Sequence, residues 1–531
     1  MVLFDWERKK VDVTTEDDDE HFKYNADARK HRFDKGTRWK DAFVILCAGF
    51  ALISDGYQNN LMSMLNKVFS LQFPKEYTSE MSTNISNASL IATIIGQVTV
   101  GVVCDYIGRK AAVIGGTFFL VIGSLVASTA HGSPHTILTW IRYCRGIIGY
   151  GIGAEYPASS TSASEAANAS VKRRGRAFVL VTNLPLSFGG PFALIVFLIV
   201  QAICKNHYTG IWKSMFAIGC FWPLAVLPFR LIATSELYKR SAVKRKVPYW
   251  LAIKFYWMRL VGISMAWFLY DFVTFPNGIF SAQIISNVIP KEQNKDLRKI
   301  AEWNLLLGVL AIPGVFIGAF LIDIIGRKWT MMIGFAGYIV FGLIVGCAYD
   351  SLSKHTAGFI VLYGFFMSSG NLGPGDCLGT VSSESFATPI RGTAYGICAA
   401  IGKVGAVVGT QAFNPIQKNL GKKWTFIIAA ICGLAGVIVS LLFVPNLNDK
   451  NNDLMEEDIR FKNYCIQHGC SKDIFGTNEA LTHDEKLFNN EIDDDDLSSD
   501  KVEVVNEDSD EGKVEVINEH SDEYTRKAHD S

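Results

Sequence analysis

Long apolar segments, separated by short polar ones, dominate the chain from Asp41 to Pro445. A helix needs roughly 20 mostly apolar residues to cross about 30 Å of hydrocarbon, and about twelve such segments are present. A charged stretch from Ser235 to Lys254 divides them into two sets of six. The pattern therefore predicts an all-α membrane protein of twelve transmembrane helices in two six-helix bundles. The segments begin near Ala42, Asn87, Ala111, Thr136, Ala177 and Ile211, and then near Leu260, Ala301, Trp329, Thr356, Gly392 and Trp424.

Polar segments set the expected topology and boundaries. No apolar signal segment precedes the first helix, so that helix must itself direct insertion and leave the N-terminus in the cytosol. Lys and Arg then cluster on the cytosolic side, as short loops of membrane proteins favour. Both termini are expected in the cytosol. The regions are an N-terminal tail (1–40), a first bundle (41–234), a central cytosolic loop (235–255), a second bundle (256–445) and a disordered acidic tail (446–531).

Composition agrees with a membrane protein and disfavours several other classes. The 531 residues are 49% hydrophobic and only 19% charged, which is too apolar for an ordinary soluble domain of this length. Formal net charge is zero, and no basic surface for nucleic acid is evident. The cysteines lie mostly singly in apolar segments, which does not indicate a metal site. No nucleophile–base arrangement is present, so we expect neither an enzyme nor a bound cofactor or metal.

Four ionisable residues stand in the middle of apolar segments: Asp55, Glu155, Asp271 and Lys403. A charge at the bilayer centre costs about 2.5 to 3.5 kcal/mol on insertion scales, so such residues are functional candidates. Lys403 has no acid in its own segment, and it therefore needs a carboxylate from another helix or an anionic solute. The three acids are candidates for carrying a proton. The alternative is that the four only form internal pairs that hold helices together.

One motif occurs twice, at equivalent places in the two halves. Asp-Tyr-Ile-Gly-Arg-Lys (105–110) follows the second segment, and Asp-Ile-Ile-Gly-Arg-Lys (323–328) follows the eighth. Each half also carries a Glu followed by Arg-Gly after its fourth segment. This repeat resembles the major facilitator superfamily, whose two halves open alternately to either side of a central site. The resemblance implies a cytosolic gate, although single members of the set could merely cap helices. The gating candidates are Asp105, Arg109, Glu165, Arg174, Asp323, Arg327, Glu384 and Arg391.

Four further segments resemble the proton-coupled phosphate transporters of that superfamily. They are Gly-Ile-Gly-Ala-Glu-Tyr-Pro (151–157), Trp-Phe-Leu-Tyr-Asp (267–271), Asn-Leu-Gly-Pro (371–374) and Gly-Lys-Val-Gly (402–405). The resemblance places Asp55 and Glu155 on a proton path. It places Asp271 both on this path and in the anion site. It also implies that the anion site is lined by Tyr156, Asn183, Trp267, Asp271, Asn371 and Lys403.

Departures from the phosphate branch indicate a larger solute. Phe275 stands where that branch has a Tyr, and Gln58 where it has a second Asp. The segment 266–280 resembles instead the fungal glycerophosphodiester permeases. Proton-coupled import of glycerophosphoinositol or glycerophosphocholine across the plasma membrane, by a monomeric unit, is therefore expected. Gln58 and Asp376, with Asn59 and Asn60, would contact the headgroup. An inorganic phosphate symporter and a non-transporting nutrient receptor of the same fold are the alternatives.

Overall fold

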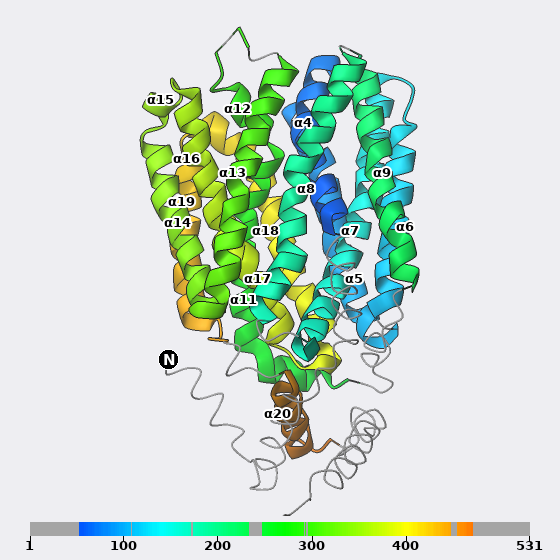
Figure 1. The fold of residues 1–531 in the computed structure, drawn as a ribbon, viewed down its shortest axis with the longest axis vertical. Helices are drawn as coiled ribbons and strands as arrows, with labels where there is room; N and C mark the ends of the chain where they lie inside the picture. Colours follow the sequence, from blue (N-terminus) through cyan, green and yellow to red (C-terminus); the bar gives the residue numbers. More distant parts are fainter. Residues whose placement is uncertain are drawn as a thin grey trace, which may run out of the picture. The chain divides into compact units, whose positions relative to one another are not determined.

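Long helices whose axes are roughly aligned make up most of the described part of the chain (Figure 1). The structure is a computed structural model that describes residues 52–107, 109–170, 174–205, 207–232, 247–290, 292–293, 296–447 and 454–470. The first half contains α4 (Leu52–Gln72), α5 (Ser79–Ile107), α6 (Arg109–Ser128), α7 (Pro134–Ser170), α8 (Arg174–Cys204) and α9 (Tyr208–Ile232). The second half contains α11 (Tyr249–Ile279), α13 (Leu297–Ile324), α14 (Arg327–Cys347), α16 (Thr356–Gly370), the π-helix η1 (Asn371–Gly375), α17 (Asp376–Glu384), α18 (Arg391–Asn419) and α19 (Trp424–Phe443). Short helices α12 (Ser281–Ser286), α15 (Tyr349–Leu352) and η2 (Thr388–Ile390) lie between them.

Nine of these helices are long and apolar enough to cross a membrane, within the part of the chain that the structure describes. Three long helical segments fall below that threshold: α4, α7 and the continuous run of α16, η1 and α17. They are less apolar because they carry polar residues that face the protein interior, among them Asp55, Glu155 and Asp376, each at most 1% exposed. Together with the nine they give the expected twelve segments in two sets of six, so the predicted all-α membrane fold is confirmed.

Helices from both halves form the interface that encloses the site. Helix α5 packs along α18, and α8 packs along α13, so each half contributes two helices to these contacts (Figure 1). Within the first half α5 packs most closely on α7, and within the second half α11 packs on α18. Since α5 and α8 belong to the first half, and α13 and α18 to the second, relative motion of the halves must alter these pairs.

The repeated motif lies at an equivalent place in each half. Asp105 lies in the last turn of α5 and Asp323 in the last turn of α13, and each motif leads directly into the next helix. Gly326, which precedes α14, has φ = 88°, a left-handed conformation that glycine adopts without steric cost. Both acids therefore stand at the same end of their helices, beside the interface between the halves.

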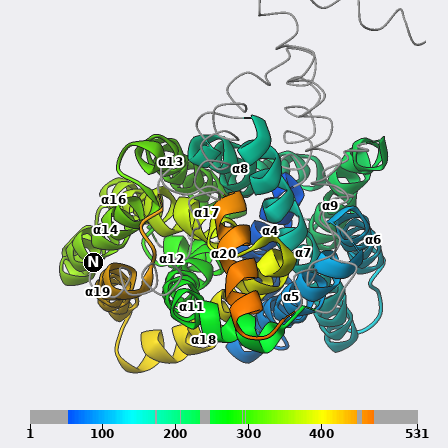
Figure 2. The same ribbon diagram turned by 90° about the horizontal axis from the view of Figure 1, so that it is seen from below.

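A short helix after the last long one contacts the end of the bundle that carries this motif. Helix α20 (Leu454–Gln467) crosses that end in Figure 2. Phe461 is fully buried against Phe255 and Tyr256, and Glu457 forms an ion pair of 2.9 Å with Arg259. The acidic composition predicts disorder from 446 on, but this stretch is helical because it has an apolar face to bury. The central loop expected over 235–255 ends earlier, since α11 begins at Tyr249.

Glycine permits the close approach of α5 and α7. A Cβ at Gly149 would overlap the backbone of Ser89, whereas a Cβ at Gly146, one turn away, would lie 3.9 Å from the nearest atom, Ala88 O. We therefore expect Gly149→Ala to destabilise the protein by about 1 to 3 kcal/mol, as overpacking usually does. Gly146→Ala is the matched control and should leave the thermal unfolding midpoint of the purified protein unchanged. Equal midpoints for the two variants would contradict this packing.

Candidate functional site

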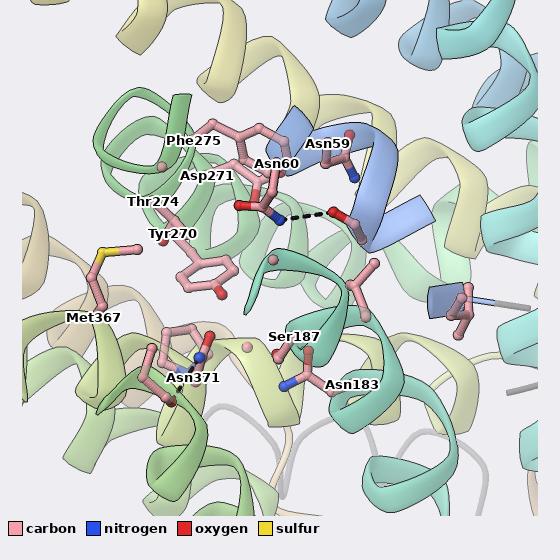
Figure 3. A pocket seen from close by; sticks show the side chains of 18 of the residues that line it. Asn59, Asn60, Asn183, Ser187, Tyr270, Asp271, Thr274, Phe275, Met367 and Asn371 are labelled. Atoms are coloured by element: carbon pink, nitrogen blue, oxygen red, sulfur yellow. Dashed lines mark hydrogen bonds between the residues drawn. The ribbon is translucent and has the colours of Figure 1, made fainter. Parts of the chain in front are cut away.

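A cavity of about 210 Å³ lies between the halves (Figure 3). Its wall is formed by α4, α7 and α8 of the first half and by α11, α12, α13, α16, η1, α17 and α18 of the second. The structure thus brings together in one wall most of the residues that the sequence predicts for solute binding, although they come from distant segments. The predicted residues in the wall are Tyr156, Asn183, Trp267, Asp271, Asn371, Asp376 and Lys403.

The ammonium of Lys403 and the carboxylate of Asp271 form a buried ion pair in this wall. Lys403 Nζ donates to Asp271 Oδ2 at 2.6 Å, and the two residues are 5% and 1% exposed. The same ammonium lies over the rings of Phe275 and Tyr156, at 4.3 and 5.8 Å from their centroids. The second half thus supplies the carboxylate that Lys403 requires. An ammonium has three N–H donors, so Lys403 can bind an anion while it remains close to Asp271.

Aromatic residues surround this ion pair. Trp267 lies one turn before Asp271 and on the same face of α11, as its spacing predicts. Its ring contacts Tyr395 edge-on at 5.5 Å, and the Tyr395 hydroxyl bonds Ser160 Oγ at 2.9 Å. Tyr395 and Ser160 both line the cavity. Sequence reasoning missed this pair, because a Tyr and a Ser on separate apolar segments carry no local signal of a shared site.

Gln58 faces away from the cavity, contrary to the headgroup role predicted for it. Its amide nitrogen donates to Ser124 Oγ at 2.7 Å and to the carbonyl of Gly219 at 3.2 Å, between α6 and α9. Successive helical residues are rotated by about 100°, so a neighbour of a wall residue often faces elsewhere. Asn59 and Asn60, the next residues along α4, do line the cavity.

The two other acids predicted for the proton path lie behind the described wall of the cavity. Asp55 is fully buried in α4, and Glu155 is 1% exposed in α7. Glu155 accepts a hydrogen bond of 2.8 Å from the hydroxyl of Thr117 on α6. Tyr156, the residue after Glu155, faces the cavity. Of the three acids, only Asp271 is thus placed where it can contact a solute directly.

Charged residues join the halves at the end that carries the repeated motif. Glu384 of the second half accepts hydrogen bonds from Arg174 of the first half at 2.8 Å and from Arg327 of its own half at 3.1 Å. All three residues are buried, with 5% exposure or less. Hydrogen bonds between ionised partners are short and strong, so this cluster ties the halves together.

The two motif acids bind helix N-termini of the opposite half in equivalent ways. Asp105 accepts from the backbone N–H groups of Gly392 and Thr393 at 3.1 and 2.7 Å, at the start of α18. Asp323 accepts from the backbone N–H of Arg176 at 3.1 Å, at the start of α8. The free N–H groups and the dipole of a helix N-terminus favour a carboxylate at both places.

The remaining gating candidates are Arg391, Arg109 and Glu165. Arg391 donates from its Nε to the carbonyl of Phe386, a residue of its own half, at 3.2 Å. Arg176, which is not among the candidates, also forms an ion pair of 3.4 Å with Asp323. The side chains of Arg109 and Glu165 lie outside the described residues, so their predicted roles stay predictions.

Neutral hydrogen bonds join the halves at the opposite end. The amide of Asn66 donates to the carbonyl of Ile279 at 3.1 Å, and the amide of Asn87 donates to Gln411 Oε1 at 3.1 Å. Both asparagines are buried, with less than 9% exposure. Among the described contacts between the halves, the charged ones therefore gather at the end with the motif and the α20 helix.

Comparison with known proteins agrees with this architecture. The family model described as sugar (and other) transporter matches residues 42–459. Glycerophosphoinositol permease 1 of Candida albicans is 65% identical over 86% of this chain and 88% of its own length. Glycerophosphoinositol transporter 1 of Saccharomyces cerevisiae is 54% identical over 84% of this chain and 87% of its own. Among solved structures, the proton:xylose symporter XylE shares the fold with a TM-score of 0.66 over 81% of this chain and 100% of its own, at 16% identity. The chain is thus a multi-pass membrane protein that belongs to the sugar (and other) transporter family of the major facilitator superfamily.

Proposed function

We propose that this chain imports glycerophosphodiesters, with glycerophosphoinositol as the main solute, across the plasma membrane by proton-coupled alternating access. One observation carries the proposal: a buried Lys403–Asp271 pair lines a cavity between the two halves. Two relatives that are more than half identical to this chain are a glycerophosphoinositol permease and a glycerophosphoinositol transporter. A glycerophosphodiester carries one phosphate anion, which matches the single ammonium of this pair.

The ion pair suggests how a proton and an anion are coupled. Asp271 and an incoming phosphate compete for the same ammonium of Lys403. A proton on Asp271 removes its negative charge, so the ammonium then binds the phosphate without a rival. When the proton leaves towards the cytosol, the carboxylate again attracts the ammonium and weakens phosphate binding. Solute and proton are therefore expected to move together.

The contacts between the halves supply the alternation. Opening at the motif end requires separation of the Arg174–Glu384 pair, and opening at the other end requires separation of neutral contacts such as Asn66–Ile279. We assign the motif end, with its basic residues, to the cytosol. A solute enters from outside while the charged contacts hold, and it leaves when the halves rock apart at the cytosolic end.

Uptake by cells that express the chain tests this function. Labelled glycerophosphoinositol should accumulate faster at acidic than at neutral external pH, because a proton accompanies each turnover. A protonophore should strongly reduce accumulation, since the solute gradient then loses its driving force. An excess of unlabelled glycerophosphoinositol should compete fully, and inorganic phosphate should compete poorly.

Three results would contradict the proposal, each in a different part. Stronger competition by inorganic phosphate than by the diester would identify a phosphate symporter. Uptake that ignores both external pH and the protonophore would remove the proton coupling. Absence of any uptake by a chain that reaches the cell surface would favour a nutrient receptor of this fold.

A further inference from the structure

Most asparagines in the described cavity wall use their amide nitrogen to bind the protein. Asn60 Nδ2 donates to the carbonyl of Gly56 at 2.9 Å, and Asn371 Nδ2 donates to the carbonyl of Ala311 at 3.0 Å (Figure 3). A backbone carbonyl only accepts hydrogen bonds, so in each case the nitrogen must face it. The carbonyl oxygen of each amide is therefore the atom left for a solute.

The same orientation is imposed on Asn183 by a carboxylate of the other half. Asn183 on α8 donates from Nδ2 to Oδ1 of Asp376 on α17 at 2.5 Å, so the bond joins the two halves inside the wall. Asp376 is 1% exposed. Because Oδ1 of Asp376 accepts this hydrogen bond, the amide nitrogen of Asn183 is committed to it and the amide oxygen remains for the cavity.

Asp376 itself is poorly placed for direct contact with a solute. One carboxylate oxygen holds Asn183, and the other lies against α13, where a Cβ at Gly318 would collide with it. Absence of a side chain at Gly318 thus makes room for this second carboxylate oxygen against α13. The headgroup contact that the sequence predicts for Asp376 is therefore indirect, through Asn183.

The cavity consequently has two chemically different regions. Lys403 offers N–H donors beside Asp271, whereas Asn183 and Asn371 offer carbonyl oxygens. A phosphate oxygen matches the first region, because it accepts hydrogen bonds. In the second region the asparagine oxygens repel a phosphate oxygen, because both only accept hydrogen bonds, and they bind a donor instead. Hydroxyl groups are the donors that a glycerophosphodiester carries.

We propose that Asp376 is a positioning residue, which fixes Asn183 so that its carbonyl oxygen, with that of Asn371, accepts hydrogen bonds from hydroxyls of the solute. This inference rests on the proposed function. The phosphate binds Lys403, and the polyol part of the diester binds the asparagine oxygens. The asparagines thereby select solutes that combine an anion with a hydroxyl-rich group.

A double-mutant cycle of transport kinetics tests this role. Asp376→Asn allows either amide to turn, so Asn183 loses its fixed orientation. We expect the KM for glycerophosphoinositol to rise about tenfold, the effect of roughly one lost hydrogen bond. Vmax per molecule at the cell surface should stay within about twofold, because Lys403 and the gate are unaffected. Asp350→Asn, the same change at an exposed site on α15, is the matched control and should alter neither value.

Variants of Asn183, the residue that Asp376 holds, separate a positioning role of Asp376 from a general structural role. In an Asn183→Leu background, Asp376→Asn should raise KM no further, because Asp376 acts only through Asn183. The exchange Asn183→Asp with Asp376→Asn keeps an acceptor at position 183 and a donor behind it, so it should recover most of the affinity. These double variants also remove the unpaired carboxylate that could impair folding of Asn183→Leu.

The outcomes distinguish this inference from the proposed function. If the parent chain takes up glycerophosphoinositol but Asp376→Asn leaves KM unchanged, the positioning role is wrong and the transport function stands. Additive effects of Asp376→Asn and Asn183→Leu on KM would also contradict the positioning role. If the parent chain at the cell surface takes up no glycerophosphodiester, both proposals are wrong.

Discussion

Lys403→Ala is expected to reduce glycerophosphoinositol uptake about 100-fold or more, the effect of losing one partner of a desolvated charge pair. Lys403 is the cation in the described wall of the cavity, and its ammonium is buried beside Asp271 and the ring of Phe275. Without it, the phosphate meets a carboxylate and no compensating charge. The measurement is the initial uptake rate per molecule at the cell surface.

A control is needed because the substitution also leaves Asp271 buried without its partner. Removing one member of a buried pair commonly costs about 3 to 5 kcal/mol of stability, which could lower the surface level by itself. The double variant Lys403→Ala with Asp271→Asn removes both charges and should recover the surface level but not the uptake. Uptake near that of the parent chain in either variant would refute the assignment of Lys403 to the phosphate.

Glu384→Gln is expected to destabilise the closed cytosolic end and to lower transport. Glu384 accepts hydrogen bonds from Arg174 and Arg327, and its removal leaves two buried guanidinium groups without that carboxylate. The expected loss is about 3 to 5 kcal/mol for the state in which this end is closed. Thiol reagents should then label Cys377, which is fully buried next to the cavity residue Asp376, more rapidly than in the parent chain.

The same substitution at an exposed ion pair provides the control. Glu302 binds Arg298 and Lys299 at 2.9 and 3.0 Å, but these side chains are 37% to 68% exposed. Exposed pairs contribute little, so Glu302→Gln should leave labelling, unfolding temperature and uptake unchanged. Unaltered Cys377 labelling in Glu384→Gln, or equal loss in both variants, would contradict the gating role.

Much of the architecture follows from the sequence because hydrocarbon imposes a strong and local constraint. Apolar segments predict where helices start: Trp424 and Thr356 are confirmed to the residue, and α14 begins at Arg327, two residues before the predicted Trp329. The prediction for α5 is less accurate, since Ser79 precedes the predicted start by eight residues. That first part of α5 is polar, and hydropathy alone does not detect helical turns outside the apolar region.

The candidate site was predictable where burial of a charge forced a conclusion. An isolated Lys403 in an apolar segment requires a carboxylate from another helix or an anionic solute, and Asp271 provides the carboxylate. The direction of a side chain around its helix was less predictable, as Gln58 demonstrates. Several other contacts between distant segments were missed, including Arg176 with Asp323 and α20 with the bundle end. These pairings depend on tertiary packing, which no local pattern encodes.

The π-helix η1 connects the cavity between the halves to the charged contacts at the motif end through the helical register. Its wider turn accommodates one more residue than an α-turn, so Asn371 and Asp376, five positions apart, both reach the cavity wall. Helix α17 continues from this turn without a break to Glu384. Loss of a single residue within 371–375 would convert this wide turn into an ordinary α-turn and keep the register of α17, whereas insertion of a further residue would rotate α17 by about 100°. After such an insertion Asp376 and Glu384 would leave their partners together, because the cavity wall and the charged contacts at the motif end share one helical register.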